Sequence, residues 1–194
     1  MQELTLMQGR SSVKRIFIIG GPGSGKTTLA RKLAAITDAP IHELDLVGYE
    51  NGAGAKRALP DKLRDVETIA ESEKWIAEGV FLWWTERLAE QADMVIWLDV
   101  PWHLAWWRIV SRHVKTSISR TNRHRGWRKL RYFLQNARRY YTGKESRPES
   151  IDDDRTVTRD ATELELARHR HKLVHCRNTR DVAAIVRLLS LLSC

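Results

Sequence analysis

Short apolar runs alternate with amphipathic segments along the first hundred residues of the chain. The apolar runs cover residues 13–20, 41–44, 75–81 and 94–100. Runs of about four to eight residues that are apolar on both faces are typical of parallel strands buried between helices. Between the first two runs, Leu29 and Leu33 predict a helix over residues 26–37 with one face toward the core. This alternation predicts an α/β fold with a parallel sheet.

The second half of the chain is predicted to be helical before it returns to this alternation. Apolar side chains recur at spacings of three and four from Trp127 to Tyr141 and predict an amphipathic helix over residues 126–141. Residues 142–162 contain few large aliphatic side chains, and we expect a mobile loop there. The acids at positions 152–154 fit a solvated turn, with a bound divalent cation as the alternative. The run at residues 172–178 predicts a fifth strand, and an amphipathic helix closes the chain.

Length and composition favour one domain over residues 1–194. A chain of this length with 42% hydrophobic residues can bury a substantial core, which excludes wholesale disorder. Asp99, Pro101 and His103 interrupt the most apolar stretch, so we expect no membrane-spanning helix. The N-terminus has no apolar core behind a basic start, which argues against a secretory leader. The two cysteines form no disulfide framework, and we expect a protein of the reducing cytoplasm.

The net charge of +9 is concentrated in one quarter of the chain. Residues 103–147 contain 13 Lys or Arg and a single acid, Glu145. We expect this basic segment to form a helical lid that attracts phosphates of a nucleotide, a nucleic acid or a lipid surface, although a solvated helix face needs no ligand. Arg108 and Arg112 share one helix face and are candidates for contacts to the transition state. The later arginines, Arg120, Arg123 and Arg125, are expected to reach phosphate only when the lid closes.

The strongest chemical signal is the glycine-rich sequence GGPGSGKT at residues 20–27. It matches the phosphate-binding pattern G-x-x-x-x-G-K-[ST], follows a predicted strand and opens a predicted helix. Glycines let main-chain N–H groups curl around an anion, Lys26 reaches the β- and γ-phosphates, and the Thr27 hydroxyl ligates Mg²⁺. The predicted cofactors are therefore ATP and Mg²⁺. The predicted nucleotide-binding residues are Gly20, Gly21, Pro22, Gly23, Ser24, Gly25, Lys26, Thr27 and Thr28.

Three acids are candidates for deciding what becomes of the phosphate. In an open parallel sheet, ligands lie beyond the carboxyl ends of the strands, where the pattern places Asp45, Glu78 and Asp99. Glu78 is expected to hold the Mg²⁺ shell or to orient an attacking hydroxyl, and Asp45 to accept its proton. Asp99 is expected to support the metal from behind its direct ligands. Each of the three also fits a turn or a helix cap without chemistry. The predicted catalytic set is Lys26, Asp45, Glu78, Arg108 and Arg112, with Thr27, Glu78 and Asp99 at the metal.

Several segments together resemble a known group of proteins. They are GGPGSGKTTLARKL, HELD, KWIAEGVF, ADMVIWLDVP with the following WRIVSRH, and KLVHCRNTRDV. The set is similar to the adenylate-kinase-related P-loop proteins known as topology modulation proteins or FlaR-like kinases, among the nucleoside and nucleotide kinases. The resemblance implies a three-layer P-loop NTPase fold with a five-stranded parallel sheet in the order 2-3-1-4-5 and a lid after the fourth strand. After Asp45 the chain has LVGYENGAGAK, where this group usually has an aromatic-rich acceptor segment.

The sequence leaves more than one function open. The leading hypothesis is ATP-dependent phosphoryl transfer to a small-molecule or nucleotide acceptor. The alternative is a nucleic-acid-binding ATPase or polynucleotide kinase that uses the basic segment at 103–147, where Tyr132 and Phe133 lie among basic side chains. A regulatory ATP binder without chemistry is a further hypothesis, and the absence of an N-K-x-D motif argues against a GTPase. A metal site near His175 and Cys176 is disfavoured, because neighbours in a strand point to opposite faces.

Overall fold

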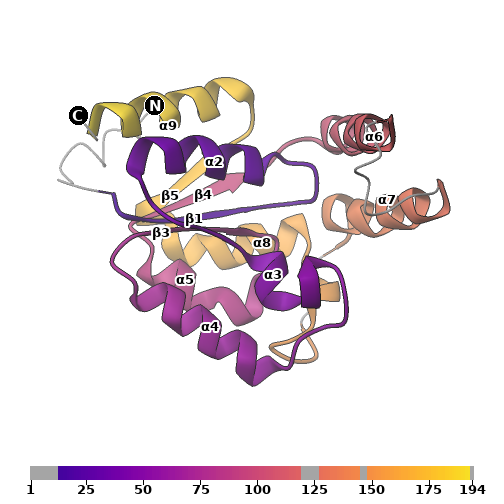
Figure 1. Ribbon diagram of the computed structural model, residues 1–194, viewed down its shortest axis with the longest axis horizontal. Helices are drawn as coiled ribbons and strands as arrows, with labels where there is room; N and C mark the ends of the chain where they lie inside the picture. Colours follow the sequence, from indigo (N-terminus) through magenta and orange to yellow (C-terminus); the bar gives the residue numbers. More distant parts are fainter. Residues whose placement is uncertain (1–12, 119–126, 145–147, 193–194) are drawn as a thin grey trace.

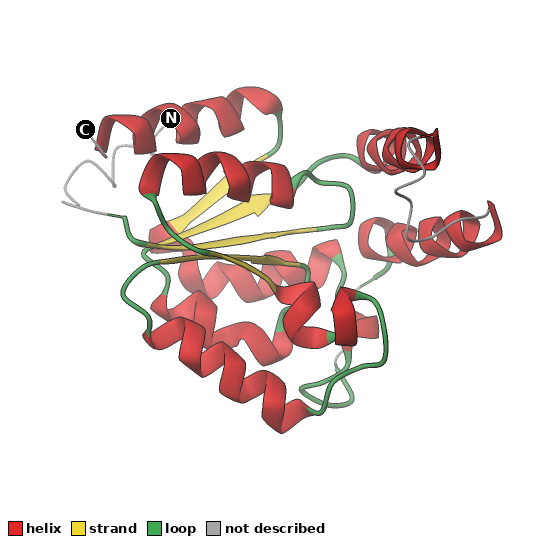
Figure 2. Ribbon diagram, viewed as in Figure 1, coloured by secondary structure: helices red, strands yellow, loops and turns green. Residues whose placement is uncertain are grey.

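A five-stranded parallel sheet lies at the centre of the computed structural model, which describes residues 13–118, 127–144 and 148–192. The strands are β1 (Arg15–Gly20), β2 (Ile41–Glu43), β3 (Trp75–Gly79), β4 (Met94–Leu98) and β5 (Leu173–Cys176). They follow the spatial order β2-β3-β1-β4-β5, and every neighbouring pair is parallel (Figure 1, Figure 2). The predicted fold class and strand order are therefore confirmed.

Helices cover both faces of this sheet. One face carries α2 (Lys26–Thr37) and α9 (Thr179–Leu192), and the other carries α4 (Leu59–Glu71), α5 (Glu86–Gln91) and α8 (Arg159–Leu166) (Figure 1). The short helix α3 (Leu44–Gly48) follows β2 directly. Short 3-10 helices are η1 (Glu50–Gly52), η2 (Trp83–Thr85), η3 (Asp154–Thr156) and the longer η4 (Ala167–Lys172).

Two longer helices, α6 (Trp102–Ile118) and α7 (Trp127–Thr142), pack together beyond the carboxyl ends of the strands. They form the described part of the expected basic lid. Residues 119–126, with Arg120, Arg123 and Arg125, lie outside the described residues, as do residues 145–147. Among the helices that the structure describes, none combines the length and the apolar character needed to cross a membrane.

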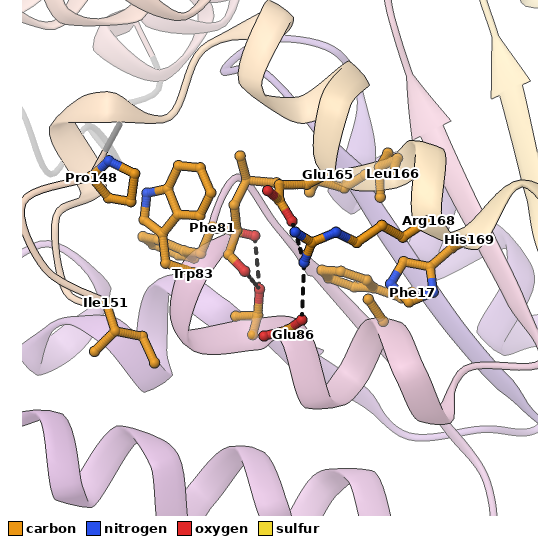
Figure 3. Close-up of a pocket in the computed structure, with 14 residues that line it drawn as sticks. Phe17, Phe81, Trp83, Glu86, Pro148, Ile151, Glu165, Leu166, Arg168 and His169 are labelled. Atoms are coloured by element: carbon orange, nitrogen blue, oxygen red, sulfur yellow. Dashed lines mark hydrogen bonds and ion pairs between the residues drawn. The ribbon is translucent and has the colours of Figure 1, made fainter. Parts of the chain in front are cut away.

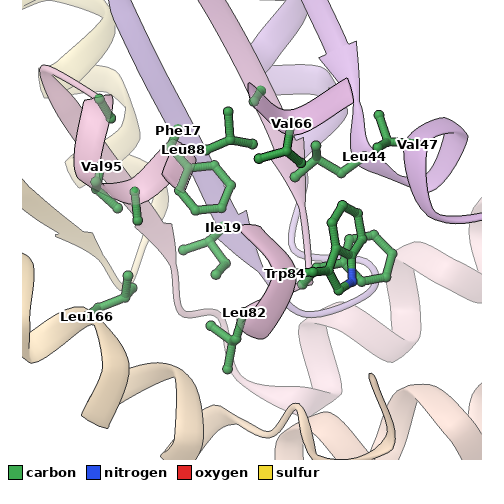
Figure 4. Packing of buried hydrophobic residues seen from close by; sticks show 14 of the residues in the cluster. Phe17, Ile19, Leu44, Val47, Val66, Leu82, Trp84, Leu88, Val95 and Leu166 are labelled. Atoms are coloured by element: carbon green, nitrogen blue, oxygen red, sulfur yellow. The ribbon is translucent and has the colours of Figure 1, made fainter. Parts of the chain in front are cut away.

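The alternation of side chains along β1 divides the core into two layers. Phe17 and Ile19 point to the face covered by α4, α5 and α8, where they join the cluster shown in Figure 4. Ile16 and Ile18 point to the face covered by α2 and α9. All four side chains are buried, and each contributes about 1.5–3 kcal/mol on leaving water. Packing on both faces explains the continuous apolar run, and it fixes the strand that leads into the glycine-rich loop.

Two element predictions are corrected by the structure. The second strand is shorter than the run at 41–44, because α3 begins at Leu44 and places Asp45 in the first turn of a helix. The loop expected at 142–162 ends earlier, because α8 begins at Arg159. The reason is a local cap that the composition does not reveal: the Thr158 side chain accepts a hydrogen bond from the Ala161 N–H.

Candidate functional site

The glycine-rich loop connects the end of β1 to the start of α2. Gly23 and Gly25 have φ angles of 81° and 103°, in the left-handed region that L side chains rarely adopt. A Cβ on Gly23 would also lie 2.7 Å from the carbonyl oxygen of Ala105 in α6. The first turn of α2 contains no acidic side chain, and its N-cap makes no side-chain hydrogen bond. The main-chain N–H groups at this helix start are therefore available to an anion such as phosphate.

Lys26 and Thr27 follow the loop and meet a carboxylate from the neighbouring strand. Lys26 Nζ donates a hydrogen bond to the Gly21 carbonyl oxygen at 3.3 Å. Thr27 Oγ1 donates to Glu78 Oε1 at 2.5 Å. Glu78 belongs to β3, where it pairs in register with Ile18 of β1. The parallel register thus brings together the hydroxyl and the carboxylate that the sequence assigned to one metal.

The Thr27–Glu78 pair suits a magnesium ion that accompanies a nucleotide. Mg²⁺ prefers oxygen donors and commonly takes one or two carboxylates beside phosphate oxygens and water. Glu78 is 6% exposed, and desolvation raises its pKa, while the charge of Lys26 opposes this rise. Desolvation lowers the pKa of Lys26, and the charges of Glu78 and Asp45 oppose that fall. Burial favours the protonated form of Glu78, and a cation bound at the pair would instead stabilise the ionised carboxylate.

Asp45 and Arg112 approach the same lysine from α3 and α6. Desolvation raises the pKa of Asp45, and the positive charges of Lys26 and Arg112 lower it. The charge of Arg112 also contributes to lowering the pKa of Lys26. Three of the other predicted catalytic residues, Asp45, Glu78 and Arg112, therefore lie within electrostatic range of Lys26.

Helices α6 and α7 contact the main chain of the loop directly. Arg108 Nη1 donates to the Ser24 carbonyl oxygen at 2.7 Å, so the fifth predicted residue supports the loop. The Tyr141 hydroxyl donates to the Pro22 carbonyl oxygen at 2.9 Å. The ring of Tyr140 packs so closely on the loop that a Cβ at position 21 would lie 2.4 Å from it. Neither tyrosine was identified from the sequence as a site residue. Helical spacing places Tyr141 on an apolar face, but it does not show that this face packs against the glycine-rich loop.

Asp99 follows β4 and is held by two side chains from distant parts of the chain. Arg159 Nε and Nη2 each lie 2.7 Å from one of its carboxylate oxygens, and His175 Nε2 lies 2.9 Å from Oδ2. Desolvation raises the pKa of Asp99, but the hydrogen bonds from His175 and Arg159 outweigh it and lower the pKa to about 2. The His175 ring stacks on Trp97 with the ring centroids 4.1 Å apart. Because both oxygens have partners within the chain, the geometry favours an anchor for α8 and β5 over the expected support of a metal.

Residues 149–157, which we call the acidic strap, contact α4 and the tryptophans that follow β3. Lys62 of α4 is fully buried; it forms an ion pair with Asp152, and its ammonium lies 5.0 Å from the Trp84 ring centroid. Trp84 Nε1 donates to Asp154 Oδ1 at 3.0 Å. These acids therefore hold the strap against the rest of the chain. The contacts of these acids correspond neither to the solvated turn nor to the cation site that the sequence suggested.

The histidines and Cys176 do not form a metal site in the described part of the chain. No group of three or more His, Cys, Asp or Glu among the described residues is arranged to hold a metal ion. His175 stacks on Trp97, which belongs to one core layer, whereas Cys176 is buried in the other. The alternation of a strand separates the two side chains, as the sequence predicted.

A pocket of about 320 Å³ lies apart from the loop, on the sheet face that carries α5 and α8 (Figure 3). Phe17 and Ile19 contribute to its apolar lining. At its edge, Arg168 Nη1 lies 3.3 Å from Glu165 and 3.5 Å from Glu86. None of its lining residues belongs to the loop or to the predicted catalytic set. This pocket is therefore separate from the phosphate chemistry.

What the loop can hold follows from its donors and charges. Main-chain N–H groups and the Lys26 ammonium supply hydrogen bonds for phosphate oxygens, and the Thr27–Glu78 pair suits the cation that accompanies them. By its fold and by this site, the chain is a P-loop nucleotide-binding protein. The family model AAA_28, described as an AAA domain, matches residues 15–182, and the chain belongs to that family.

Individual relatives cover less of the chain or resemble it more weakly. The HslU ATPase subunit of an ATP-dependent protease from Rickettsia rickettsii is 33% identical over 66 residues, which is 34% of this chain and 15% of that protein. The protein YqaC of Bacillus subtilis is 28% identical over 89 residues, which is 45% of this chain and 50% of that protein. The chain thus spans half or less of the length of these relatives.

Solved kinase structures are similar over most of their length. A gluconokinase from Sinorhizobium meliloti has 20% identity and a TM-score of 0.49, and the alignment covers 95% of this chain and 93% of that one. A shikimate kinase from Bacteroides thetaiotaomicron has 17% identity and a TM-score of 0.46, with 94% and 100% covered. The P-loop part of the resemblance found in the sequence is confirmed by the family match, and the narrower relation to topology modulation proteins stays a prediction.

Proposed function

We propose that the chain is an ATP-dependent kinase that transfers the γ-phosphoryl group of ATP to a hydroxyl of a small-molecule or nucleotide acceptor. The observation that carries this proposal is the glycine-rich loop whose Thr27 hydroxyl donates to Glu78, with Asp45 and Arg112 near enough for their charges to act on Lys26. A phosphate-binding loop by itself only holds a nucleotide. Phosphoryl transfer also needs a base, such as an ionised carboxylate, to take the acceptor proton and a cation to stabilise the transferring oxygens, and this site offers both.

Each residue then has a distinct role. Lys26 and the loop N–H groups bind the phosphate oxygens. Thr27 and Glu78 would hold Mg²⁺, which neutralises charge between the β- and γ-phosphates when bound. Asp45 accepts the proton of the acceptor hydroxyl. The hydroxyl oxygen forms a bond to the γ-phosphorus, and the bond from that phosphorus to ADP breaks. Arg112 stabilises the charge on the transferring group, a contact worth about 10³–10⁵ in rate in related chemistry.

Two further observations refine the proposal: the contact of Arg108 with the loop and the position of the lid. Arg108 donates to the Ser24 carbonyl oxygen, so we assign it to positioning the loop rather than to contact with the transferring group. The basic helix α6 begins at Trp102, four residues after β4 ends. A lid in this place is what the resemblance to adenylate-kinase-related proteins implies, and we propose that the chain is related to them.

Titration calorimetry with ATP and Mg²⁺, combined with an ADP-release assay over nucleosides, nucleotides and small hydroxyl compounds, tests the proposal. Lys26→Ala should remove both ATP binding and ADP release. Lys32→Ala is the matched control, because Lys32 is an exposed lysine of the same helix. Asp45→Asn should keep ATP binding and lower transfer by about 10²–10⁴.

The outcomes separate the competing functions. Retained turnover in Lys26→Ala would refute the assignment of the loop. ATP binding without ADP release above solvent hydrolysis, for every acceptor tried, would refute the kinase and identify a regulatory ATP binder. An equal loss of ATP binding in Asp45→Asn and Lys26→Ala would remove the distinction between binding and proton transfer on which the mechanism depends.

A further inference from the structure

The α6–α7 pair presents aromatic side chains that the proposed phosphoryl transfer does not use. Trp106 and Trp107 of α6 are 43% and 63% exposed, and Tyr132 and Phe133 of α7 are 68% and 41% exposed. Large aromatic side chains release much free energy when they leave water, so their exposure on these two packed helices indicates a contact surface.

A groove of about 460 Å³ lies between the two helices. Its lining includes Trp102 and Trp106, one turn apart on α6, and Leu130, Arg131, Leu134 and Arg138 of α7. The interior is therefore aromatic and aliphatic, with guanidinium groups contributed by α7. A concave surface of this kind can take a flat apolar ring that is attached to an anion.

The charged side chains of the two helices that form the groove have one sign. The sequence contains no acidic residue from position 100 to position 144. Arg131 and Arg138 are exposed, and the ion pairs among the described residues include no basic side chain of α7. Positive charge that the described residues do not compensate attracts a polyanion from outside.

We propose that the α6–α7 surface binds single-stranded nucleic acid, with bases stacked on the exposed aromatic rings and phosphates paired with the arginines. Aromatic platforms beside a basic track are the means by which proteins hold single strands without sequence preference. An anionic lipid surface fits less well, because a membrane-binding helix lays a continuous apolar face on the bilayer. The buried residues Leu130 and Ala137 of α7 instead pack with Ile109 of α6. This inference goes beyond the proposed kinase activity and does not depend on it.

Fluorescence anisotropy of a labelled 20-nucleotide oligothymidylate, titrated with the full chain between 50 and 300 mM NaCl, tests the proposal. We expect binding whose affinity falls steeply with salt, because each phosphate contact to a single strand adds about 0.7 to the log–log slope. The double variant Arg131→Glu with Arg138→Glu should lower the slope by about 1.4 and weaken binding at least tenfold. The control is Arg31→Glu with Lys32→Glu on α2, two exposed residues whose reversal changes the net charge equally, and it should bind like the unmodified chain.

Substitutions of Trp106 test whether bases stack on the aromatic side chains. Trp106→Ala should weaken binding by about 5- to 150-fold, the loss expected for one stacked base. Trp106→Phe keeps a stacking ring and should restore most of the affinity, which separates lost stacking from a lost fold. A 20-base-pair duplex should bind less tightly than the single strand, because its bases are not available for stacking.

Several results would overturn the proposal. These are no binding at 50 mM NaCl, equal weakening by the α2 control, or unchanged affinity in Trp106→Ala, which would leave only nonspecific attraction of a polyanion. Phosphatidylserine vesicles that bind more tightly than the oligonucleotide and compete with it would identify a lipid surface instead. Lys26→Ala should leave oligonucleotide binding intact, and its loss would place the strand at the phosphate loop. A failure of the kinase assay would not affect these measurements.

Discussion

Replacing Asp99 by Asn should lower the free energy of unfolding by about 2 kcal/mol at pH 7. The pKa of Asp99 is about 2 in the folded chain against an ordinary value of 3.8, because hydrogen bonds from His175 and Arg159 outweigh desolvation. Each unit of pKa difference corresponds to about 1.4 kcal/mol, which gives the expected loss. The Asp99 side chain is only 5% exposed, so solvent screening reduces this value little.

The pH dependence of this loss has a definite sign. The folded pKa lies below the unfolded one, so the ionised carboxylate stabilises the fold. Its contribution is fully present above about pH 5 and disappears as the pH falls through about 2. The difference in unfolding free energy between the unmodified chain and Asp99→Asn should therefore stay constant from pH 7 to pH 5 and fall to roughly half at pH 3.

Urea unfolding followed by circular dichroism at these three pH values measures the effect. Asp61→Asn is the control, because Asp61 pairs with Arg64 at an exposed site and such pairs contribute about 0–1 kcal/mol. Equal stability of Asp99→Asn and the unmodified chain at pH 7, or a difference that grows toward acid, would refute the electrostatic reasoning. The Mg²⁺ concentration that half-saturates ATP binding should be the same in both. If Asp99→Asn needed more Mg²⁺ for ATP binding but kept its stability, Asp99 would instead be assigned to supporting the metal.

Two further predictions concern the buried charges of the site and of the acidic strap. ATP affinity in the presence of Mg²⁺ should weaken as the pH falls, with a midpoint above the ordinary range of a glutamate, because desolvation raises the pKa of Glu78 and a protonated acid does not hold the cation. Calorimetry from pH 5 to pH 8 measures this, and the same profile in Glu78→Gln would show that another group titrates. Asp152→Ala should lower the free energy of unfolding by about 3 kcal/mol, the low end for a broken buried pair, because Asp152 is 28% exposed while Lys62 is fully buried. Adding Lys62→Met should recover part of the loss in urea unfolding, and an equal loss in the single and double variants would show that the buried ammonium costs nothing.

The fold was predictable from the sequence wherever its cause is local. β1, the glycine-rich loop and the start of α2 at Lys26 follow from consecutive residues whose periodicity and turn chemistry agree. The strand order came from the resemblance, since periodicity alone does not specify which strands are neighbours. The helix α3 and the cap of α8 were missed, because short elements carry too few residues to show a period.

The site was predictable in its residue types and less so in its contacts. Thr27 and Glu78 are 51 residues apart, yet both follow recognisable strand and loop signals, and they meet. Asp99 has the same strand-end signal, but its partner Arg159 lies 60 residues further on, in a segment expected to be a loop. The buried pair of Lys62 and Asp152 spans 90 residues and leaves no pattern in either segment. Pairings of this kind depend on tertiary packing, which a single sequence does not record.

The close approach of α6 to the phosphate loop has a consequence for how the loop motif is understood. The motif accepts any residue at position 23, but the Ala105 carbonyl leaves no room there for a side chain. The need for glycine at that position thus comes both from the positive φ of the loop and from a helix more than 80 residues away. A loop grafted into another P-loop scaffold would keep every motif residue but lose the support that α6 gives it, including the hydrogen bond from Arg108 to the Ser24 carbonyl oxygen.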